Sequence, residues 1–319
     1  MSKQLNSEQR YAIYLGLARK SSIKSIAREI GVSFSTVYRE IKRNSKADGT
    51  YVHIIAQKRC DSRKHGLAGN HRKSDRLWWE IERLIREEQW SPEQIAGVLR
   101  REGIKICKQT IYNHIRKNPK LIEFLPHRLK YRRRMRKQPV TKATNITDRI
   151  SIHERPVEAD GTRYGDWEMD TIVDSYGHAI LTLVERSTNF MMMERLPEGR
   201  KAVPLAKLAV RLLFPYRQHI KTITTDNGSE FAAHKLISKG LKIRGRDAPN
   251  VYFTDAYSSW QKGCIENTNK LVRRYIPKKA NFNRFSDKFI KNVQHKLNNR
   301  PRKKLHFMTP KFVYFKNLY

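Results

Sequence analysis

Residues 22–43 carry a hydrophobic pattern that predicts two short helices joined by a turn. Three isoleucines fall on one helical face, and a glycine follows at the position where a helix end favours a positive φ. These residues are Ile23, Ile26, Ile30 and Gly31. A preceding helix over about residues 7–19 supplies the third member of a small bundle. The pattern is that of a helix-turn-helix unit.

The second helix of this unit presents two different faces. Ser33 is placed to cap it, and Phe34, Val37 and Ile41 recur at helical spacing and are expected to face the core. The opposite face carries hydroxyl and basic groups, which suit phosphates and base edges in the major groove of DNA. The residues expected to contact DNA are Ser35, Thr36, Tyr38, Arg39, Lys42 and Arg43.

A second unit repeats the first. Ser91, Pro92 and Gln94 form a strong helix start with a capping box, and Gly103 closes that helix. Residues 110–118 then match residues 36–44: both read Thr, a β-branched residue, Tyr, two variable residues, Ile, two basic residues and Asn. A plain helical bundle with solvated charges is the alternative, but an internal repeat favours two DNA-reading helices. The second is expected to use Thr110, Tyr112, Asn113 and Arg116.

The second half of the chain changes from helical to strand periodicity. Residues 164–174 alternate, with Trp167 and Met169 on one face and Asp170 and Ile172 on the other. Further strands are predicted over 178–185, 189–196, 221–225 and 251–253, with helices over 201–218 and 260–275. The expected fold class is α + α/β: tandem helix-turn-helix domains followed by a mixed β-sheet flanked by helices.

The charge balance points to a polyanionic partner. The chain carries 66 Lys and Arg against 30 Asp and Glu, a formal net charge of +36. Both halves share the excess, because residues 1–150 hold 35 basic and 14 acidic side chains and residues 151–319 hold 31 and 16. Such a surplus favours nucleic acid as the partner, since binding releases counterions from the phosphate backbone.

The cysteines and the hydropathy give the expected compartment. Cys60, Cys107 and Cys264 are odd in number and scattered, which favours a reducing cytoplasm over a disulfide framework. No apolar signal segment or membrane-length apolar run stands out. We expect a bacterial cytoplasmic protein associated with the nucleoid, with no membrane partner.

Three acidic residues interrupt this basic sequence in an arrangement that can hold metal ions. Asp170 lies within the first predicted strand, Asp226 ends the fourth, and Glu266 lies on the helix that follows. Carboxylates that approach one another on a polyanion-binding surface need a cation, and Mg²⁺ prefers such oxygen ligands. Two plainer alternatives exist: Asp226 can belong to an ordinary turn, and Glu266 can form a surface pair with Lys270.

The motifs around these acids resemble those of a known family. The segments 165–170, 226–231 and 260–270 read GDWEMD, DNGSEF and WQKGCIENTNK, and NNRPRK follows at 298–303. Together with the paired helix-turn-helix units, they resemble the DDE transposases of bacterial insertion sequences. The chain is similar to the insertion-sequence-thirty family, whose core is of the ribonuclease-H and retroviral-integrase type.

The resemblance implies specific roles for these residues. It implies that Asp170, Asp226 and Glu266 are catalytic and bind two Mg²⁺ ions per active site, with Mn²⁺ able to substitute. Glu168 is the alternative first carboxylate, because it shares a strand face with Asp170. Arg273 is implied as a contact to the DNA backbone, and Lys270 belongs to the same basic helix face. Gly228 and Gly263 are implied as positions of close approach.

These inferences predict four domains and one principal function. The domains are a first helix-turn-helix domain at 1–60, a second at 61–125, a basic linker at 126–160 and the catalytic core at 161–319. The expected function is a transposase that binds terminal inverted repeats of double-stranded DNA, then cleaves and joins strands as a homodimer or higher oligomer. It needs no small-molecule cofactor. The alternative is a non-enzymatic DNA-binding regulator derived from a transposase; a general ribonuclease would not account for the tandem DNA-reading helices.

Overall fold

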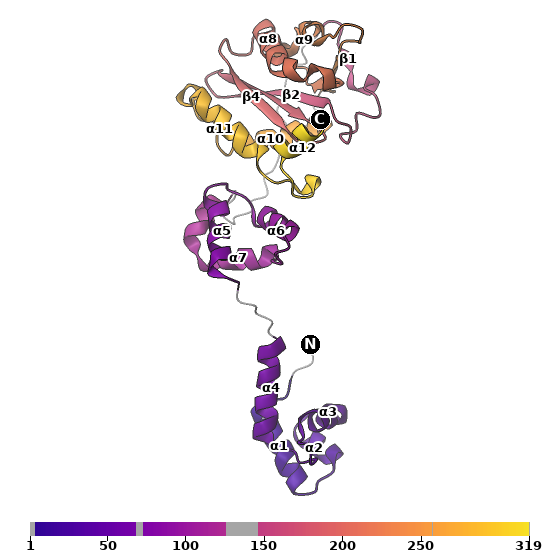
Figure 1. The fold of residues 1–319 in the computed structure, drawn as a ribbon, viewed down its shortest axis with the longest axis vertical. Helices are drawn as coiled ribbons and strands as arrows, with labels where there is room; N and C mark the ends of the chain where they lie inside the picture. The colour runs from indigo at the N-terminus through magenta and orange to yellow at the C-terminus, as the bar shows by residue number, and fades with distance from the viewer. Residues whose placement is uncertain (1–3, 68–72, 126–145, 257, 319) are drawn as a thin grey trace. The chain divides into compact units, whose positions relative to one another are not determined.

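The computed structural model of the chain describes residues 4–67, 73–125, 146–256 and 258–318 (Figure 1). The chain divides into two compact units, Met1–Ser74 and Asp75–Tyr319. Among the described residues, no helix is both long and apolar enough to cross a membrane.

The first unit contains the predicted helix-turn-helix. Its described helices are α1 (Ser7–Ala18), α2 (Ile23–Glu29), α3 (Phe34–Asn44) and α4 (His53–Leu67). Ile13, Ile26 and Val37 are fully buried between them. Gly31 has a φ of 66° between α2 and α3, which is the left-handed conformation that glycine tolerates best. An ion pair from buried Arg10 to Glu40, with 2.6 Å between Nε and Oε1, ties α1 to α3.

Two expectations for this unit are corrected. Phe34 does not face the core: its side chain is 47% exposed and stacks on Tyr38, because the first turn of α3 projects beyond the apolar cluster. Ser33 is the N-cap residue of α3, but its hydroxyl contacts the hydroxyls of Ser35 and Thr36 rather than a backbone N–H. In addition, α4 continues across the predicted boundary at 60/61 between the two helix-turn-helix domains.

The second helix-turn-helix opens the second unit. It consists of α5 (Asp75–Arg86), α6 (Pro92–Arg101) and α7 (Lys108–Lys117), followed by the 3₁₀ segment η1 (Pro119–Phe124). The capping box predicted from the sequence is present, because Ser91 and Gln94 exchange side-chain to backbone hydrogen bonds. Ile111 and Ile115 of α7 are fully buried, whereas the opposite face of that helix is open.

A six-stranded mixed sheet forms the centre of the core. Its order is β1-β6-β5-β2-β3-β4, in which β2, β3 and β4 are antiparallel and β5, β6 and β1 extend the sheet in parallel from β2. The strands are β1 (Ile150–Ser151), β2 (Asp166–Val173), β3 (Ala179–Glu185), β4 (Met191–Leu196), β5 (Thr222–Thr225) and β6 (Asn250–Phe253). The predicted meander and the two later strands are therefore confirmed.

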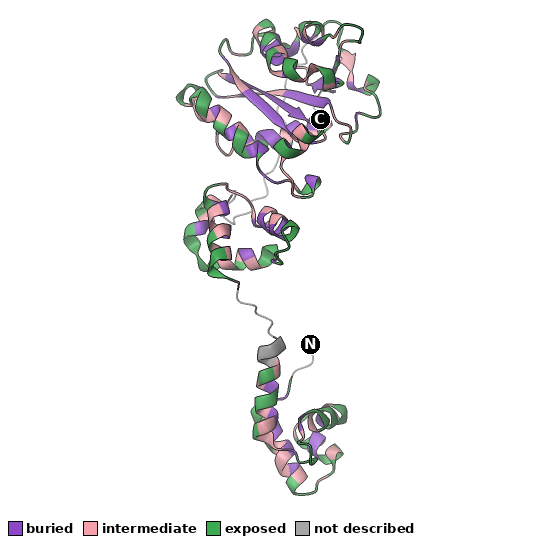
Figure 2. Cartoon of the chain, viewed as in Figure 1, coloured by how far each residue is buried: buried purple, intermediate pink, exposed green. Residues whose placement is uncertain are grey.

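Helices cover both faces of this sheet (Figure 1). α8 (Ala202–Leu213) and α9 (His234–Leu241) lie on one side, and α10 (Gly263–Val272) and α11 (Asp287–Asn298) on the other. α12 (Pro310–Lys316) adds Tyr314 to the first of these two apolar layers. The strands are buried while the outer helix faces are exposed (Figure 2). Short 3₁₀ segments include η5 (Ser259–Lys262) and η6 (Phe282–Arg284).

The alternation along β2 explains why the sheet can be covered on both sides. Trp167 and Met169 belong to the apolar layer under α8 and α9, whereas Ile172 belongs to the layer under α10 and α11. An antiparallel meander extended by parallel strands and covered by helices is the ribonuclease-H-like arrangement that was expected. The predicted basic linker is only partly described: residues 126–145 lie outside the described residues, and residues 150–151 already form β1.

Candidate active site and DNA interface

The pairing of β2 with β5 brings Asp170 and Asp226 together. These strands are parallel, and Glu168 is paired with Thr224. Asp170 and Asp226 each follow two residues after that pair, so they occupy equivalent positions at the same edge of the sheet. Because side chains alternate along a strand, a residue two positions after a paired residue points to the same face of the sheet as that residue does.

The side chain of Lys262 lies between these two carboxylates. Its Nζ is 2.9 Å from Oδ2 of Asp226 and 3.5 Å from Oδ1 of Asp170. The lysine comes from η5 and its side chain is only 7% exposed, whereas that of Asp226 is 45% exposed. The two acids therefore share one buried ammonium group at the start of α10.

The remaining oxygens of the two carboxylates also have partners. Oδ1 of Asp170 accepts the backbone N–H of Thr171 at 2.9 Å, and Oδ2 accepts Nδ2 of Asn269 at 3.0 Å. Oδ1 of Asp226 accepts the backbone N–H of Gly228 at 3.1 Å. The side-chain carbonyl of Asn269 is buried without a hydrogen-bond partner. A buried carbonyl oxygen of this kind is costly unless something binds it.

The electrostatics of this group follow from burial and mutual proximity. Burial opposes the charge of Lys262, but Asp170 and Asp226 outweigh it and raise the pKa of the lysine. Burial raises the pKa of Asp170, and the neighbouring Asp226 adds to that shift while Lys262 opposes it. The site is thus a pair of acids held together by a cation, as expected when like charges approach in a poorly hydrated place.

Glu266 also lies on α10, but its carboxylate pairs with a lysine of the same helix. It stands four residues after Lys262 and three before Asn269, which places it on the same side of α10. Its Oε1 instead pairs with Nζ of Lys270 at 3.0 Å, as the plainer alternative predicted. Among the described residues, no three His, Cys, Asp or Glu side chains gather closely enough to hold a metal ion.

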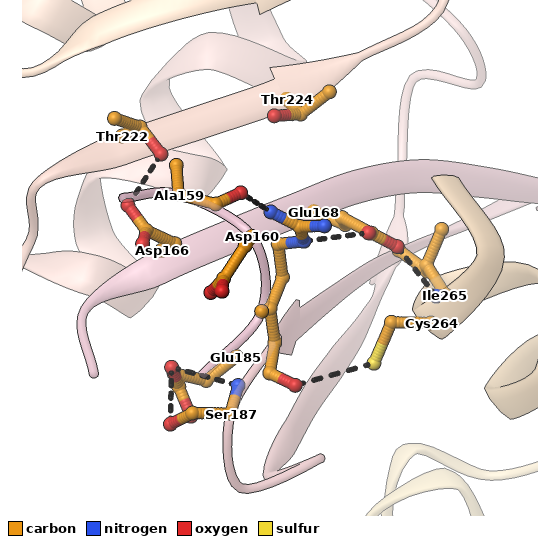
Figure 3. A network of polar contacts seen from close by, with 12 residues as sticks. Ala159, Asp160, Asp166, Glu168, Glu185, Ser187, Thr222, Thr224, Cys264 and Ile265 are labelled. Carbon is orange, nitrogen blue, oxygen red and sulfur yellow. Dashed lines mark hydrogen bonds and ion pairs between the residues drawn. The ribbon is translucent and has the colours of Figure 1, made fainter. Parts of the chain in front are cut away.

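Glu168, the alternative first carboxylate, is fully engaged within the fold (Figure 3). Its Oε1 accepts Nε of Arg186 at 3.0 Å, and its Oε2 accepts the backbone N–H of Ile265 at 2.7 Å. The side chain is 1% exposed. Glu168 therefore joins β2 to the first turn of α10, whereas Asp170, two residues further along, faces Lys262.

Two glycines were expected to allow close approach, and their surroundings in the structure differ. A Cβ atom at Gly228 would lie 2.6 Å from Oε2 of Glu230 and 3.1 Å from Oδ1 of Asp226, so a side chain there would force the Glu230 carboxylate to move. No heavy atom lies within 4 Å of a Cβ atom built at Gly263. Within the described chain, Gly263 is therefore not a position of close approach, because it starts α10 beside open space.

The basic residues of α10 are partly committed to the fold. Lys270 pairs with Glu266, and Arg273 donates from Nη2 to the backbone carbonyl of Val173 at 2.8 Å. The Arg273 guanidinium also lies 5.5 Å from the ring centre of Phe282, and its Nη1 is buried without a partner. Burial lowers the pKa of Arg273. The structure thus gives Arg273 a role in anchoring α10 to the end of β2, and its contact to DNA stays a prediction.

The two predicted DNA-reading faces are open to solvent. On α3 the side chains of Ser35, Tyr38, Arg39, Lys42 and Arg43 are exposed, and Thr36 is half-buried. On α7, Asn113 and Arg116 are exposed, whereas Thr110 and Tyr112 are half-buried. Phe34 and Tyr38 add a stacked aromatic pair to the α3 face, with ring centres 6.1 Å apart.

Comparisons with known proteins assign the chain to a family. A helix-turn-helix domain family matches residues 2–44. The transposase for insertion sequence element IS4351 of Bacteroides fragilis is 42% identical, over 97% of this chain and 95% of that protein. The transposase for element IS1086 of Cupriavidus metallidurans is 32% identical, over 97% and 93%. Transposase InsI for element IS30A of Escherichia coli is 34% identical, over 97% and 82%.

The chain belongs to the insertion-sequence-thirty family of transposases. Its helix-turn-helix domain and its relatives imply that this transposase binds DNA. Transposases of this kind generally use a divalent metal ion.

The donor set of the candidate site fits such an ion. Asp170 and Asp226 offer carboxylate oxygens that already converge on a cation, and the free carbonyl oxygen of Asn269 lies on the residue that contacts Asp170. Mg²⁺ and Mn²⁺ prefer such oxygen ligands. Glu266 shares the helix face of Lys262 and Asn269, but its carboxylate pairs with Lys270.

The sequence analysis did not single out three residues of this candidate site: Lys262, Asn269 and Glu230. Lys262 and Asn269 lie at helical spacing on either side of Glu266, and that spacing could have placed all three on one face. Glu230 is 5% exposed and accepts the hydroxyl of Thr171 at 2.8 Å. It belongs to the motif that begins at Asp226, but nothing in its spacing indicated that it would be buried.

Proposed function

We propose that this transposase binds the terminal inverted repeats of its mobile element and carries out metal-dependent cleavage and strand transfer on DNA. Asp170 and Asp226 are the first metal ligands, and Glu266 completes the set. The observation that carries this proposal is the meeting of Asp170 and Asp226 around one cation at the edge of the sheet.

The placement of these acids supports catalysis rather than a purely regulatory role. A regulator that only binds DNA gains nothing from two carboxylates beside its substrate, since they repel the phosphate backbone. Bound Mg²⁺ would reverse that repulsion, activate a water or a 3′-hydroxyl and stabilise the leaving oxygen. The chain itself would hold the ligands in place through backbone hydrogen bonds from Thr171 and Gly228.

The open faces of α3 and α7 support the proposed recognition of DNA ends. Both are second helices of helix-turn-helix units, which is the helix that enters the major groove in such proteins. Two recognition helices in tandem would cover a longer DNA site than one. Because two element ends must be cut and joined, we propose that the active assembly on DNA is at least a homodimer.

The test follows 3′-end cleavage and strand transfer on a duplex that carries the element end, with Mg²⁺ and then Mn²⁺. The variants are Asp226→Asn and Glu266→Gln. Glu198→Gln is the matched control, because Glu198 also forms an exposed pair with a lysine, Lys201, at 3.3 Å. We expect both site variants to bind the duplex as the wild type does but to cleave it at least about a thousandfold more slowly.

The results separate the possible outcomes. Cleavage by Asp226→Asn at the wild-type rate would remove the metal-site assignment. Loss of activity in Glu198→Gln would show that the assay reports surface charge rather than catalysis. A wild type that binds element ends tightly but never cuts with either metal would be a DNA-binding regulator.

A further inference from the structure

Lys262 makes the same contacts that a divalent ion would need. Its ammonium group forms an ion pair with Oδ2 of Asp226 and lies close to Oδ1 of Asp170, and its side chain is nearly inaccessible to solvent. An ammonium nitrogen and a hard metal ion both bind carboxylate oxygens, but they cannot occupy the same place. The lysine and the metal are therefore competitors for one position.

We infer that Lys262 is an internal competitor of the catalytic metal, which holds Asp170 and Asp226 together until a divalent ion displaces its ammonium group. The inference rests on the proposed function, because it assumes that these two acids bind the metal. It goes further by assigning to Lys262 control over the affinity of the site for metal.

The other contacts of the two acids show why the lysine is the partner that gives way. The backbone N–H groups of Thr171 and Gly228 are fixed by the main chain and can stay while a metal binds. Lys262 reaches the site through a flexible four-carbon stem, which can withdraw without moving the sheet. It also lies at the end of the short segment η5, directly before α10.

Removal of the lysine should therefore strengthen metal binding. The burial of Lys262 strengthens its electrostatic attraction to Asp226, whereas the partial exposure of Asp226 weakens that attraction. We expect Lys262→Met to bind Mn²⁺ about tenfold more tightly than the wild type. The methionine keeps the approximate length of the side chain but offers no positive charge.

The experiment is a calorimetric Mn²⁺ titration of the full chain without DNA, which needs no catalytic activity. Lys201→Met is the matched control: it also removes one lysine that pairs with a carboxylate, but at the surface, where the lysine is 69% exposed. Asp226→Asn and the double variant Lys262→Met/Asp226→Asn show whether the gain arises at this site. We expect the control to match the wild type and the gain to vanish in the double variant.

Thermal unfolding provides a second readout. Lys262→Met should unfold at a lower temperature than the wild type, because two neighbouring carboxylates lose their shared cation, and Mn²⁺ should raise its melting temperature more than it raises that of the wild type. If Lys262→Met does not fold, Lys262→Arg tests the same idea from the other side. Its fixed guanidinium should hold the acids at least as firmly and bind Mn²⁺ no more tightly than the wild type does.

The outcomes distinguish this inference from the proposed function. If Mn²⁺ binds the wild type through Asp226 but Lys262→Met binds it no more tightly, the inference is wrong and the metal site stands. If Asp226→Asn leaves Mn²⁺ binding unchanged in both the wild-type and Lys262→Met backgrounds, the proposed metal site itself is wrong. Tighter binding by Lys262→Arg than by the wild type would also overturn the inference.

Discussion

Strand β2 holds acidic residues in two different ways along its length. At its start, Asp166 binds Arg163 through both oxygens, at 3.0 Å and 2.8 Å, and Glu168 binds Arg186 and a backbone N–H. Further along, Asp170 meets a lysine at 3.5 Å and an asparagine side chain. Figure 3 shows part of the first region: Asp166 accepts a hydrogen bond from the hydroxyl of Thr222, and Glu168 accepts one from the backbone N–H of Ile265.

The difference teaches how one strand can serve both the fold and the chemistry. Planar guanidinium groups and backbone amides hold the first two acids in fixed geometry, which suits a structural role. A lysine is a point charge on a flexible stem and can be replaced by another cation. On this basis, the acids whose cationic partner is an arginine stabilise the fold, and Asp170, whose cationic partner is a lysine, is the acid that we propose for the metal.

The largest expected effect comes from Asp170→Asn. Loss of one metal ligand should slow DNA cleavage at least about a thousandfold, which corresponds to about 4 kcal/mol of transition-state stabilisation. The free energy of unfolding should change by less than about 1 kcal/mol, because Lys262 keeps Asp226 at 2.9 Å. Single-turnover cleavage and urea unfolding measure the two effects. Unchanged cleavage would place Asp170 with the structural acids.

Glu168→Ala should show the opposite result: a large loss of stability with metal binding retained. It leaves the Arg186 side chain, which is 12% exposed, without its carboxylate, and it removes the acceptor of the Ile265 N–H. We expect a loss of about 3 kcal/mol in the free energy of unfolding, measured by urea denaturation. Mn²⁺ binding by the folded protein should persist. If the variant stays stable but loses Mn²⁺ binding, Glu168 rather than Asp170 is the first ligand.

Asp174 extends the comparison just beyond the end of β2. Burial opposes its charge, but N–H groups of Phe282, Tyr176 and His178, together with the His178 ring, outweigh it and lower the pKa from 3.8 to about 2. A lowered pKa stabilises the fold above the unfolded value, and that stabilisation is lost as the pH falls through the folded value.

Asp174→Asn should therefore lose about 2 kcal/mol of stability at pH 7. The difference from the wild type should be constant above about pH 4 and should shrink towards pH 2, as thermal melts across this range would measure. Asp287→Asn, which alters a carboxylate that is 78% exposed, is the control at pH 7 and should change the melting temperature little. A difference that grows on acidification would contradict this assignment.

The comparison also shows what the sequence could and could not predict. The strand alternation placed Asp170 opposite Trp167 and Met169, and the motif at Asp226 followed a clear strand, so the meeting of these two acids could be expected. The ion pair between Lys262 and Asp226 could not, because it joins residues 36 positions apart and depends on how η5 enters α10. A lysine in a basic protein is ordinarily read as a solvated charge.

Tertiary context also overrode local patterns elsewhere. The spacing of Phe34 placed it with Val37 on the core face, yet only Val37 is buried, since the bundle is too small to cover the first turn of α3. The apolar positions of α11 lie among polar and basic residues, and no helix was predicted over that segment although it covers one face of the sheet. The partners of Glu168, Arg186 and the backbone N–H of Ile265, lie on other segments, so sequence periodicity alone could not distinguish this acid from Asp170.

The smallest expected effect concerns the third acid, Glu266, and tests whether it is free to move. Its partner Lys270 is 57% exposed, and exposed pairs four residues apart on a helix contribute little. Lys270→Ala should therefore change the free energy of unfolding by less than about 0.5 kcal/mol. Lys201→Ala removes the comparable pair with Glu198 and should behave alike in the same urea titration.

The result for Lys270→Ala decides whether Glu266 belongs with the structural acids or with the proposed metal ligands. A small change means that Glu266 can leave its lysine at little cost in free energy. A metal ligand on the helix face of Lys262 and Asn269 must be able to turn towards Asp170 in this way. A loss well above that of Lys201→Ala would mean that Lys270 fixes Glu266 as firmly as Arg186 fixes Glu168. Glu266 would then be a structural acid, and the third ligand would have to come from another residue.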